Sequence, residues 1–490
     1  MQKSIKVSLF LLMLLLCYIG FLMYSNSLCL QRWDEARCAL QALAMSKNHN
    51  FIVTYYQGLP DLWNTKPPLL IWIQALLFNL FSPSVLVFRL PAFLAAISLC
   101  FFIYWYFIKY HANYFIGIVS TIILISCNGI SRMHGARTGE YDTLLVFFTT
   151  TYLISFFQFL ESKNKIWLAL FFILLIAASL TKGIQALFFM PALLIYTVLT
   201  KNLKQLLTST NFYIGVFAYL FFVAGYYLLR EYYNPGFLKI VWLNELGGRY
   251  SGVIESHKAP FVFYFGRLWK NLNGFWFIFL VLSVPQVFRL KDLVLKKISL
   301  YLLGCSMAYL LVISIAQTKL DWYDMPVYPL LAIVIAICVV TALSTLYKNK
   351  LVGFQKMLLL IFIVIIFSIP ISLHEHKFFR FIKAQHKNDE MCAAYFLHHN
   401  LKYEKLNLNN CYVQGNLDCS YSGQIEFYQE LYKNKNQQLH LFFWNQDTIT
   451  APCKLITQYE ATKHFAEQHF DYKIIKEDIQ LRLYELYKQK

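Results

Sequence analysis

Apolar segments long enough to cross a lipid bilayer recur along most of this 490-residue sequence. Hydrophobic residues make up 58% of the chain and charged residues only 14%, a composition that excludes an ordinary soluble enzyme. The first segment is followed by a weak signal-peptidase site, so we expect it to be retained as a helix. The predicted spans are residues 7–24, 86–106, 114–130, 143–160, 166–180, 184–199, 212–229, 272–288, 298–315, 326–346 and 357–373.

Basic residues are distributed unevenly between the two sides of this predicted polytopic α-helical membrane domain. A further apolar segment, residues 67–81, is short, and we predict that it lies along the membrane interface. The amino terminus and the loops on its side then hold 14 Lys and Arg residues, whereas the short loops opposite hold only Arg132, Arg137, Lys182 and Lys319. Because cytoplasmic loops are enriched in basic residues, the sequence predicts about 11 crossings with a cytoplasmic amino terminus.

This topology gathers the polar segments on the external face. The membrane domain is predicted to comprise residues 1–373, with the external segments 25–66 and 231–270 lying over a common site. A transporter would more often place its key charges near the bilayer midplane. The other external segments of this domain are residues 132–142, 181–183 and 317–324.

Residues 374–490 are predicted to form a small soluble α/β domain on the external side. They carry 15 basic and 14 acidic residues, so most of the net charge of +18 belongs to the membrane domain, where it suits lipid surfaces and phosphate groups. No nucleic-acid motif is found in the sequence. Cys411 and Cys419 are candidates for a disulfide, with Cys392 or Cys453 as other partners, and free thiols are the alternative. The predicted strands are 410–414, 439–444, 472–475 and 480–484, and the predicted helices include 424–431 and 461–470.

Two carboxylates, Asp34 and Glu35, open a helical pattern outside the first span, between Arg32 and Arg37. Acidic groups this close to a membrane are costly unless they are paired, hydrated or coordinated, which makes them functional candidates. An acid in a first helical turn is also an ordinary cap. Capping accounts for one carboxylate but not for two, so we predict that Asp34 and Glu35 are catalytic residues and that Arg37 binds substrate.

A second external loop repeats the combination of an acid with an arginine. Asp142 begins an apolar helix, and Arg137 precedes it by five residues. Helix capping is again the alternative role for the acid. A carboxylate can accept a proton from an attacking hydroxyl group or bind a metal. Asp142 is therefore a third predicted catalytic residue, and Arg137 a predicted substrate-binding residue.

Further cations complete the candidate site. Lys66 precedes Pro67-Pro68, which starts a helix, so its ammonium group is predicted to be held at the interface as a partner for phosphate. Snorkelling toward lipid headgroups is the alternative. His257 in segment 231–270 is a candidate metal ligand, phosphate donor or structural residue. The remaining substrate-binding candidates are Arg249, Lys319 and Tyr323.

Taken in order, these motifs resemble those of the GT-C glycosyltransferases. The resemblance is closest to the bacterial branch that contains the lipid A aminoarabinose transferase, within the protein mannosyltransferase superfamily. It covers residues 1–345 approximately. The motifs are W-D-E-A-R (Trp33–Arg37), G-L-P-D-L-W-N-T-K-P-P-L (Gly58–Leu69), R-L-P (Arg89–Pro91), A-R-T-G-E-Y-D-T-L-L (Ala136–Leu145), L-T-K-G (Leu180–Gly183), R-Y…H-K-A-P-F (Arg249–Phe261) and T-K-L-D-W-Y-D-M-P-V-Y-P (Thr318–Pro329).

The resemblance implies an inverting transfer of a sugar from a polyprenyl-phosphate donor, such as undecaprenyl phosphate, to a lipid or protein acceptor. The reaction would take place on the periplasmic face of the bacterial inner membrane. Asp34 matches the family's acid in the first external loop, the candidate general base or acceptor-positioning group, and Asp142 matches the acid of the second loop. Lys66 matches the lysine that contacts the donor phosphate. The residues expected to line the same headgroup site are Arg137, Lys319 and Tyr323.

One residue departs from the family pattern. The transferase usually has a Glu before Lys-Pro-Pro, which is proposed to bind a metal together with a histidine that His257 matches. Here that position is Thr65, and a threonine does not replace an anionic ligand well. Zinc binding at this site is therefore disfavoured, and whether the protein needs a divalent metal stays open. The substitution also argues against equating this chain with the aminoarabinose transferase itself, and the transferred sugar stays open.

Three functions are compatible with the sequence. The first is transfer of a lipid-linked sugar to lipid A or a similar envelope glycolipid. The second is transfer of the same kind of donor to protein Ser or Thr residues, which needs a peptide groove. The third is transport of a lipid or sugar without chemistry. The chain contains no nucleotide-binding signature, which fits a donor carried on a polyprenyl phosphate.

Overall fold

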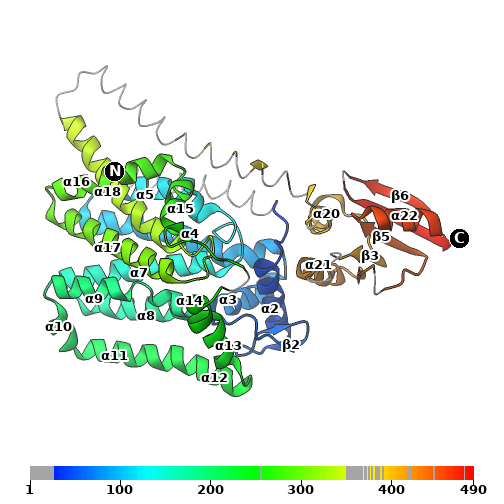
Figure 1. The fold of residues 1–490 in the computed structure, drawn as a ribbon, viewed down its shortest axis with the longest axis horizontal. Helices are drawn as coiled ribbons and strands as arrows, with labels where there is room; N and C mark the ends of the chain where they lie inside the picture. The colour runs from blue at the N-terminus through cyan, green and yellow to red at the C-terminus, as the bar shows by residue number, and fades with distance from the viewer. Residues whose placement is uncertain are drawn as a thin grey trace.

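The computed structural model describes residues 27–253, 256–348, 391–415, 421–444, 447–478 and 480–490, with isolated positions between 368 and 388. The predicted span 7–24 and nearly all of 357–373 lie outside the described residues, as does Cys419 of the predicted disulfide. The three other cysteines considered for that disulfide are free thiols. Figure 1 shows a helical body with a smaller α/β part beside it.

The described part of the body contains six helices long and apolar enough to cross a membrane, or seven if one bent pair counts as a span. In that pair, α15 (Phe263–Asn271) and α16 (Phe275–Arg289) are bent by 113°. The chain is thus a multi-pass membrane protein. The six are α4 (Val85–His111), α7 (Tyr141–Ser162), α8 (Lys165–Lys182) with η1 (Gly183–Leu187), α11 (Thr210–Tyr219) with η2 (Leu220–Ala224) and α12 (Gly225–Tyr233), α17 (Leu293–Ile315), and η4 (Met325–Val327) with α18 (Tyr328–Lys348).

Three shorter apolar helices accompany them, and each alone falls short of the about 20 residues that a span needs. One of these, α3 (Leu69–Phe81), is the segment predicted to lie along the interface. The predicted number of crossings stays a prediction, because two of the predicted spans are not described. The other two short apolar helices are α5 (Tyr114–Ser126) and α9 (Met190–Leu199), and the remaining short helices are α6 (Asn128–Ser131), α10 (Leu203–Leu207), α13 (Phe237–Val241), η3 (Trp242–Leu246) and α14 (Gly247–Ser251).

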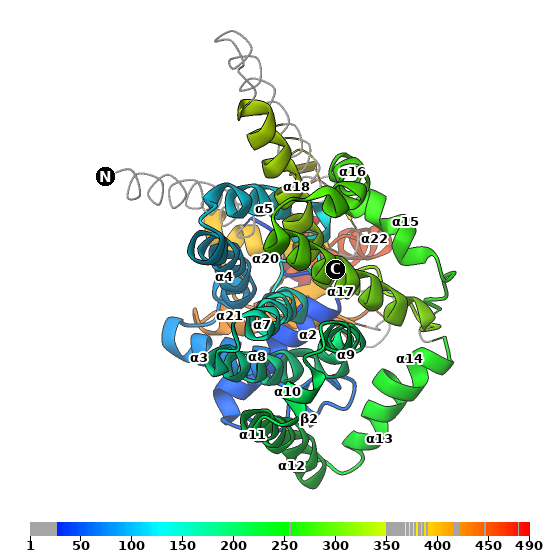
Figure 2. The ribbon, with the colours of Figure 1, turned by 90° about the vertical axis from the view of Figure 1, so that its left-hand side faces the viewer.

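Helix α7 forms the centre of the body. Its most apolar stretch is 83% buried, and α4, α8 and α18 pack around it (Figure 2). Three of its buried hydroxyl groups are satisfied within the helix, because Thr149, Thr151 and Ser155 donate to carbonyl oxygens four residues earlier. Asp142 lies in the first turn of this helix, so the most enclosed helix carries a predicted catalytic acid at its end.

The segment before α3 folds against the body as α2 (Asp34–Asn48) and a small hairpin of β1 (Tyr55–Tyr56) and β2 (Leu59–Pro60). Asp61 organises this segment, because its carboxylate accepts two hydrogen bonds from Arg37, at 2.7 and 2.8 Å, and one from Gln41, at 2.5 Å. Asn64 donates to Gln41 and to the Tyr141 hydroxyl. The hairpin segment is thereby tied both to α2 and to the start of α7.

The carboxyl-terminal part contains a five-stranded mixed sheet in the order β4-β3-β5-β7-β6. The pairs of β3 with β4 and β5 are parallel, and β7 pairs antiparallel with β5 and β6. The prediction of a carboxyl-terminal α/β region is confirmed, although β5 was not predicted. The elements are α20 (Cys392–His399), η6 (Asn400–Glu404), β3 (Cys411–Gln414), α21 (Gly423–Lys433), β4 (Leu439–Phe442), β5 (Cys453–Thr457), α22 (Glu460–His469), β6 (Phe470–Glu477) and β7 (Arg482–Gln489).

This α/β part shares a hydrophobic core with the external segment of the body. Buried side chains of α2, α3 and α4 belong to the same apolar cluster as those of α20 and α21. In Figure 1, α21 lies beside α2. The carboxyl-terminal domain is therefore packed against the helix that begins with Asp34.

Candidate functional site

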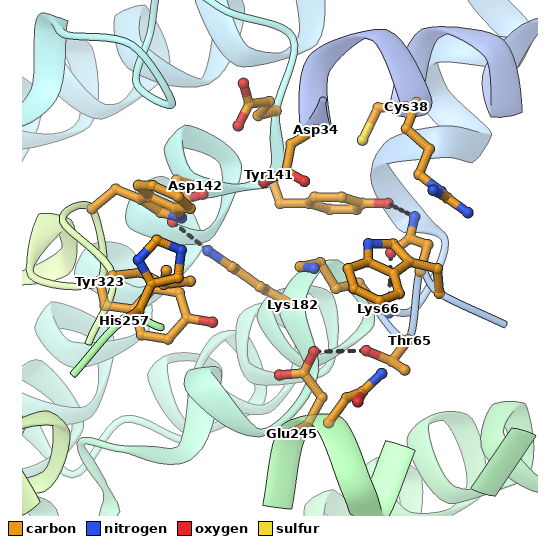
Figure 3. Close-up of a pocket in the computed structure, with 17 residues that line it drawn as sticks. Asp34, Cys38, Thr65, Lys66, Tyr141, Asp142, Lys182, Glu245, His257 and Tyr323 are labelled. Carbon is orange, nitrogen blue, oxygen red and sulfur yellow. Dashed lines mark hydrogen bonds and ion pairs between the residues drawn. The ribbon is translucent and has the colours of Figure 1, made fainter. Parts of the chain in front are cut away.

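A cavity of about 140 Å³ opens where α2, the segment before α3 and the segment 231–270 meet the helical body. The start of α2, the segment before α3, the start of α7 and the end of α8 enclose it together with η3 and the loop before η4. Figure 3 shows these side chains pointing into a common space. The lining residues are Asp34, Arg37, Cys38, Trp63, Asn64, Thr65, Lys66, Glu140, Tyr141, Asp142, Lys182, Asn244, Glu245, His257, Leu320, Trp322 and Tyr323.

Asp34 is the first residue of α2, and its side chain faces the cavity (Figure 3). Among the described residues its carboxylate has no hydrogen-bond or ion-pair partner, and it does not cap its own helix. The capping role that the sequence left open is therefore not used. An exposed carboxylate without a partner is available to accept a proton from a substrate.

Asp142 and Lys182 form a buried ion pair in the wall of the cavity. The Lys182 Nζ lies 2.5 Å from Asp142 Oδ1, and both side chains are about 4% exposed. The Lys182 ammonium group also lies 5.0 Å from the centre of the Tyr323 ring, over its face. In Figure 3 it extends from α8 toward the middle of the cavity. The ion pair therefore holds a positively charged ammonium group and a carboxylate in fixed positions in the wall of the cavity.

Lys66 supplies a second cation to the same cavity. Its ammonium group lies 5.8 Å from the centre of the Tyr141 ring, and Pro67 and Pro68 follow it directly before α3 begins at Leu69. The two prolines restrict the backbone at this point, as the sequence predicted. Lys66 and Lys182 therefore line one cavity from two separate elements.

Glu245, in segment 231–270, contacts Thr65, the residue that stands where the family usually has a glutamate. The Thr65 hydroxyl donates a hydrogen bond of 2.6 Å to Glu245 Oε1 (Figure 3). His257 lines the same cavity, and its backbone oxygen accepts from the Lys319 amide at 2.9 Å. The Thr65 hydroxyl is thus engaged as a donor to Glu245, and the expectation that no metal is bound at Thr65 stays a prediction.

Another group of side chains has the donor atoms that a divalent metal prefers. Asp34, His134 and Glu140 each place one ligand atom within 4.8 Å of the others. Two carboxylates and one imidazole form a common ligand set for such ions. The Trp322 ring stacks on His134, with 3.7 Å between ring centres. Of the described residues, these three are the ones that could hold a metal, at the edge of the cavity next to Asp34.

His134 and Glu140 also form an ion pair with each other. Burial opposes the protonation of His134, but the negative charges of Glu140, Asp34 and Asp142 outweigh burial and raise the pKa of His134 above its ordinary value of 6.5. Burial raises the pKa of Glu140 above its ordinary value of 4.5, so the ion pair stabilises the fold at pH values below 6.5 where Glu140 is still ionised. That contribution is lost as the pH rises through the higher pKa of the folded protein.

We expect replacement of His134 by Gln to destabilise the protein by about 1 kcal/mol at low pH and by less at high pH. The measurement is the difference in Tm between the parent protein and the variant in detergent, from about pH 6 to about pH 9. His464→Gln, at an exposed histidine of α22, is the control and should leave Tm unchanged. A Tm difference that is constant across this range would contradict the raised pKa.

Several predicted residues lie elsewhere. Glu35 is fully buried and pairs with Arg89 at 2.7 Å, while its carboxylate also accepts from the amides of Gln31 and Gly139. It points away from the cavity, because neighbouring residues of a helix face different directions. The predicted catalytic role of Glu35 is therefore corrected to a structural one.

Two predicted substrate-binding residues are buried outside this cavity. Arg137 is fully buried, and Lys319 donates from its ammonium group to the Ala316 carbonyl at 2.5 Å. Neither side chain lines the cavity, so their predicted contact with the headgroup is not seen. The side chain of Arg249 lies outside the described part of the chain. The predicted residues that the structure does bring together are Asp34, Asp142, Lys66, Arg37, Tyr323 and His257.

Sequence reasoning missed four charged or titratable residues near this cavity. Three of them, Lys182, Glu140 and Glu245, line the cavity. The fourth, His134, forms an ion pair with Glu140. A lysine that ends an apolar run was a usable signal for Lys182, since such a charge is costly near the membrane unless it is paired. Glu245 meets Thr65, and His134 and Glu140 meet Asp34, through contacts between segments far apart in the sequence, which spacing does not reveal.

A second cavity, of about 230 Å³, adjoins the first. The two cavities share Thr65, Lys66, Lys182 and Glu245. Beyond these residues the lining is mostly apolar and comes from η1, η2, α12 and α13. It includes Pro67, Gly183, Ile184, Leu187, Tyr219, Val223, Tyr227, Leu238 and Val241. The first, polar cavity and the second, mostly apolar cavity therefore meet at Lys66 and Lys182.

Known proteins share this sequence pattern and this fold. A family model described as dolichyl-phosphate-mannose-protein mannosyltransferase matches residues 65–227. Crystal structures of ArnT from Cupriavidus metallidurans are similar: the form bound to undecaprenyl phosphate gives a TM-score of 0.66 at 14% identity, covering 98% of this chain and 97% of that one. The chain has a GT-C glycosyltransferase fold. The resemblance to the GT-C and protein mannosyltransferase enzymes that the motifs indicated is thus confirmed.

Two uncharacterised proteins of Aquifex aeolicus also resemble this chain in sequence. One is 26% identical over 309 residues, and the other is 28% identical over 333 residues. The first match spans 62% of this chain but only 58% of the relative, and the second spans 67% and 73%. These matches report sequence similarity alone, and the reaction is argued from the site.

Proposed function

We propose that this protein is a glycosyltransferase that moves a sugar from a polyprenyl-phosphate donor to lipid A or a similar envelope glycolipid. The observation that carries the proposal is the meeting of the polar and apolar cavities at Lys66 and Lys182. A lipid-linked sugar phosphate has the same division into an apolar chain, a phosphate and a polar sugar. Each part of such a donor has a matching surface in the structure.

The two lysines suit the phosphate of the donor. Ammonium groups bind phosphate as point charges, and a cation beside a leaving phosphate stabilises the charge that develops there. The first isoprene units would occupy the apolar cavity beyond Pro67 and Ile184, and the sugar would lie toward Asp34. The ArnT structure that holds undecaprenyl phosphate has this fold, which supports a ligand of that class.

The reaction we propose is an inverting displacement at the anomeric carbon. The acceptor hydroxyl oxygen forms the new bond to this carbon, and its proton passes to the Asp34 carboxylate, which has no other partner among the described residues. The bond between the anomeric carbon and the phosphate oxygen breaks, and polyprenyl phosphate leaves with the electron pair. Lys182 is held by Asp142 at 2.5 Å, so its charge does not need to move during the step.

The proposed site lies on the periplasmic face of the bacterial inner membrane, where lipid acceptors of the envelope are exposed. The asymmetry of basic residues between the two sides supports this orientation. A protein acceptor is the second candidate, and the family model that matches residues 65–227 favours it, because its description names a protein mannosyltransferase. The two candidates share the donor chemistry and differ in the acceptor alone.

Mass spectrometry of lipid A from cells with and without the protein tests the proposal. An added mass of the size of a sugar that depends on the protein would support the lipid acceptor. The same mass on envelope proteins, with lipid A unchanged, would replace the lipid acceptor by the protein acceptor. Absence of any sugar transfer to either fraction would overturn the glycosyltransferase assignment.

Binding of undecaprenyl phosphate to the purified protein tests the lysines separately. We expect Lys66→Ala to weaken binding by about 10- to 100-fold, because a charged hydrogen bond to phosphate is lost. Lys239→Ala, at an exposed lysine of α13 that does not line the cavity, should leave the affinity unchanged. Equal loss in both variants would show that general attraction by positive charge, not this site, binds the phosphate.

A further inference from the structure

The residue before Asp34 has an unusual backbone conformation. Trp33 has φ 66° and ψ −115°, a region that bulky side chains rarely occupy because Cβ meets the backbone. Such a conformation costs about 1–3 kcal/mol and persists only where the surroundings enforce it. Since Trp33 is the N-cap residue of α2, its conformation sets the direction in which Asp34 leaves the chain.

The carboxyl-terminal domain holds this residue in place. The Tyr421 ring stacks on the Trp33 ring, with 4.8 Å between centres and 18° between planes. The Tyr421 hydroxyl donates a hydrogen bond of 2.9 Å to the Trp33 carbonyl oxygen. Seven residues further on, in α21, the buried Tyr428 hydroxyl accepts from the Leu30 amide at 3.0 Å. Both bonds reach backbone atoms of the short stretch that leads into α2.

Helix α4 holds the same stretch from within the body. Arg89 pairs with Glu35 and also donates to the carbonyl oxygens of Leu28 and Cys29, at 2.7 and 2.9 Å. The backbone from Leu28 to Glu35 is therefore fixed between two domains that are far apart in the sequence. Asp34 is the side chain within this stretch that faces the cavity without a partner among the described residues.

We infer that the carboxyl-terminal domain is a positioning element of the active site, in which Tyr421 keeps Trp33 in its strained conformation and so directs the Asp34 carboxylate into the cavity. The catalytic consequence rests on the proposed function. A shift of about 1 Å in a reacting group can cost about 100-fold in rate, so a contact that fixes the backbone beside Asp34 affects the chemistry without touching substrate. Tyr421 is then a positioning residue.

Hydrogen–deuterium exchange on the full-length protein tests the positioning without any assay of activity. We expect Tyr421→Ala to speed the amide exchange of residues 28–37 by about tenfold, because one hydrogen bond and one ring contact are lost. Tyr421→Phe keeps the ring and should give a smaller increase. Tyr432→Phe is the matched control: this buried tyrosine of α21 bonds to Asn400 and Leu397 within its own domain, and the variant should leave the exchange of residues 28–37 unchanged.

Kinetics then separate positioning from a merely structural role. If the transfer reaction is found as proposed, Tyr421→Ala should lower kcat by about 10- to 100-fold and leave KM for the donor and the Kd for undecaprenyl phosphate unchanged, since Lys66 and Lys182 do not depend on Trp33. Partial recovery in Tyr421→Phe is expected. A parallel fall in kcat, affinity and Tm would show a structural role instead.

The two sets of measurements can fail separately. If exchange at residues 28–37 is the same in Tyr421→Ala as in the parent protein, the positioning inference is wrong whatever the reaction. If exchange increases but no sugar transfer is found with any acceptor, the positioning of Trp33 stands and the proposed function fails. The inference about catalysis survives only if exchange and kcat change together in Tyr421→Ala and neither changes in Tyr432→Phe.

Discussion

Replacing Asp34 by Asn is expected to lower the rate of sugar transfer by about three orders of magnitude and to leave Tm unchanged. The amide cannot accept the proton of the acceptor hydroxyl, so the step that forms the new bond slows. Tm should not change because the Asp34 carboxylate has no hydrogen-bond or ion-pair partner among the described residues and does not cap α2. The sugar-dependent mass of the product and the Tm of purified protein measure the two effects.

The control for this experiment is Asp321→Asn. Asp321 lies on the same face of the protein, is half exposed and pairs with Arg267, but it does not line the cavity. The Asp321→Asn variant should therefore transfer sugar at the normal rate. Normal transfer by Asp34→Asn would remove Asp34 from the mechanism and direct attention to Glu140, the other acid on that side of the cavity.

Replacing Arg89 by Ala is expected to destabilise the protein by about 3–5 kcal/mol, because Glu35 is left charged and unpaired in the interior. Both side chains of this pair are almost completely buried, and Arg89 Nε lies 2.7 Å from Glu35 Oε1. The carbonyl oxygens of Leu28 and Cys29 lose a donor as well. We expect a large fall in Tm in detergent solution and poor recovery of folded protein.

An exposed pair and a double variant complete the comparison. Lys297→Ala removes the partner of Glu161 in a pair that faces solvent, and the loss should stay within about 1 kcal/mol. Glu35→Leu together with Arg89→Leu should recover part of the stability, since two apolar residues no longer leave a buried charge. If Arg89→Ala lowers Tm no more than Lys297→Ala does, the buried Glu35–Arg89 pair does not stabilise the protein as its burial indicates.

The comparison of Asp34 with Glu35 shows what the sequence could and could not predict. Their position beside the membrane marked both as functional candidates, but spacing alone did not tell which one faces the cavity. Successive residues on a helix point about 100° apart, so one of the two can face the cavity while the other meets Arg89 of α4. That choice depends on packing between segments far apart in the sequence.

The membrane helices and the carboxyl-terminal α/β domain were predictable because they rest on local patterns of apolar residues. The same holds for Lys66, which the two prolines place directly before α3. Lys182 and Glu245 were not predicted, since their roles arise from contacts with Asp142 and Thr65 that span 40 and 180 residues. The domain contact through Tyr421 spans 388 residues and left no pattern in the sequence at all.

The meeting of the two cavities at Lys66 and Lys182 also bears on turnover. A donor phosphodiester carries one negative charge, whereas the polyprenyl phosphate left after transfer carries between about 1.5 and 2 at neutral pH. The same two ammonium groups therefore attract the spent lipid more strongly than the fresh donor. If the proposed donor is correct, its chain would still lie in the apolar cavity after transfer, and we expect the spent carrier to leave slowly and to inhibit transfer when it accumulates in the membrane.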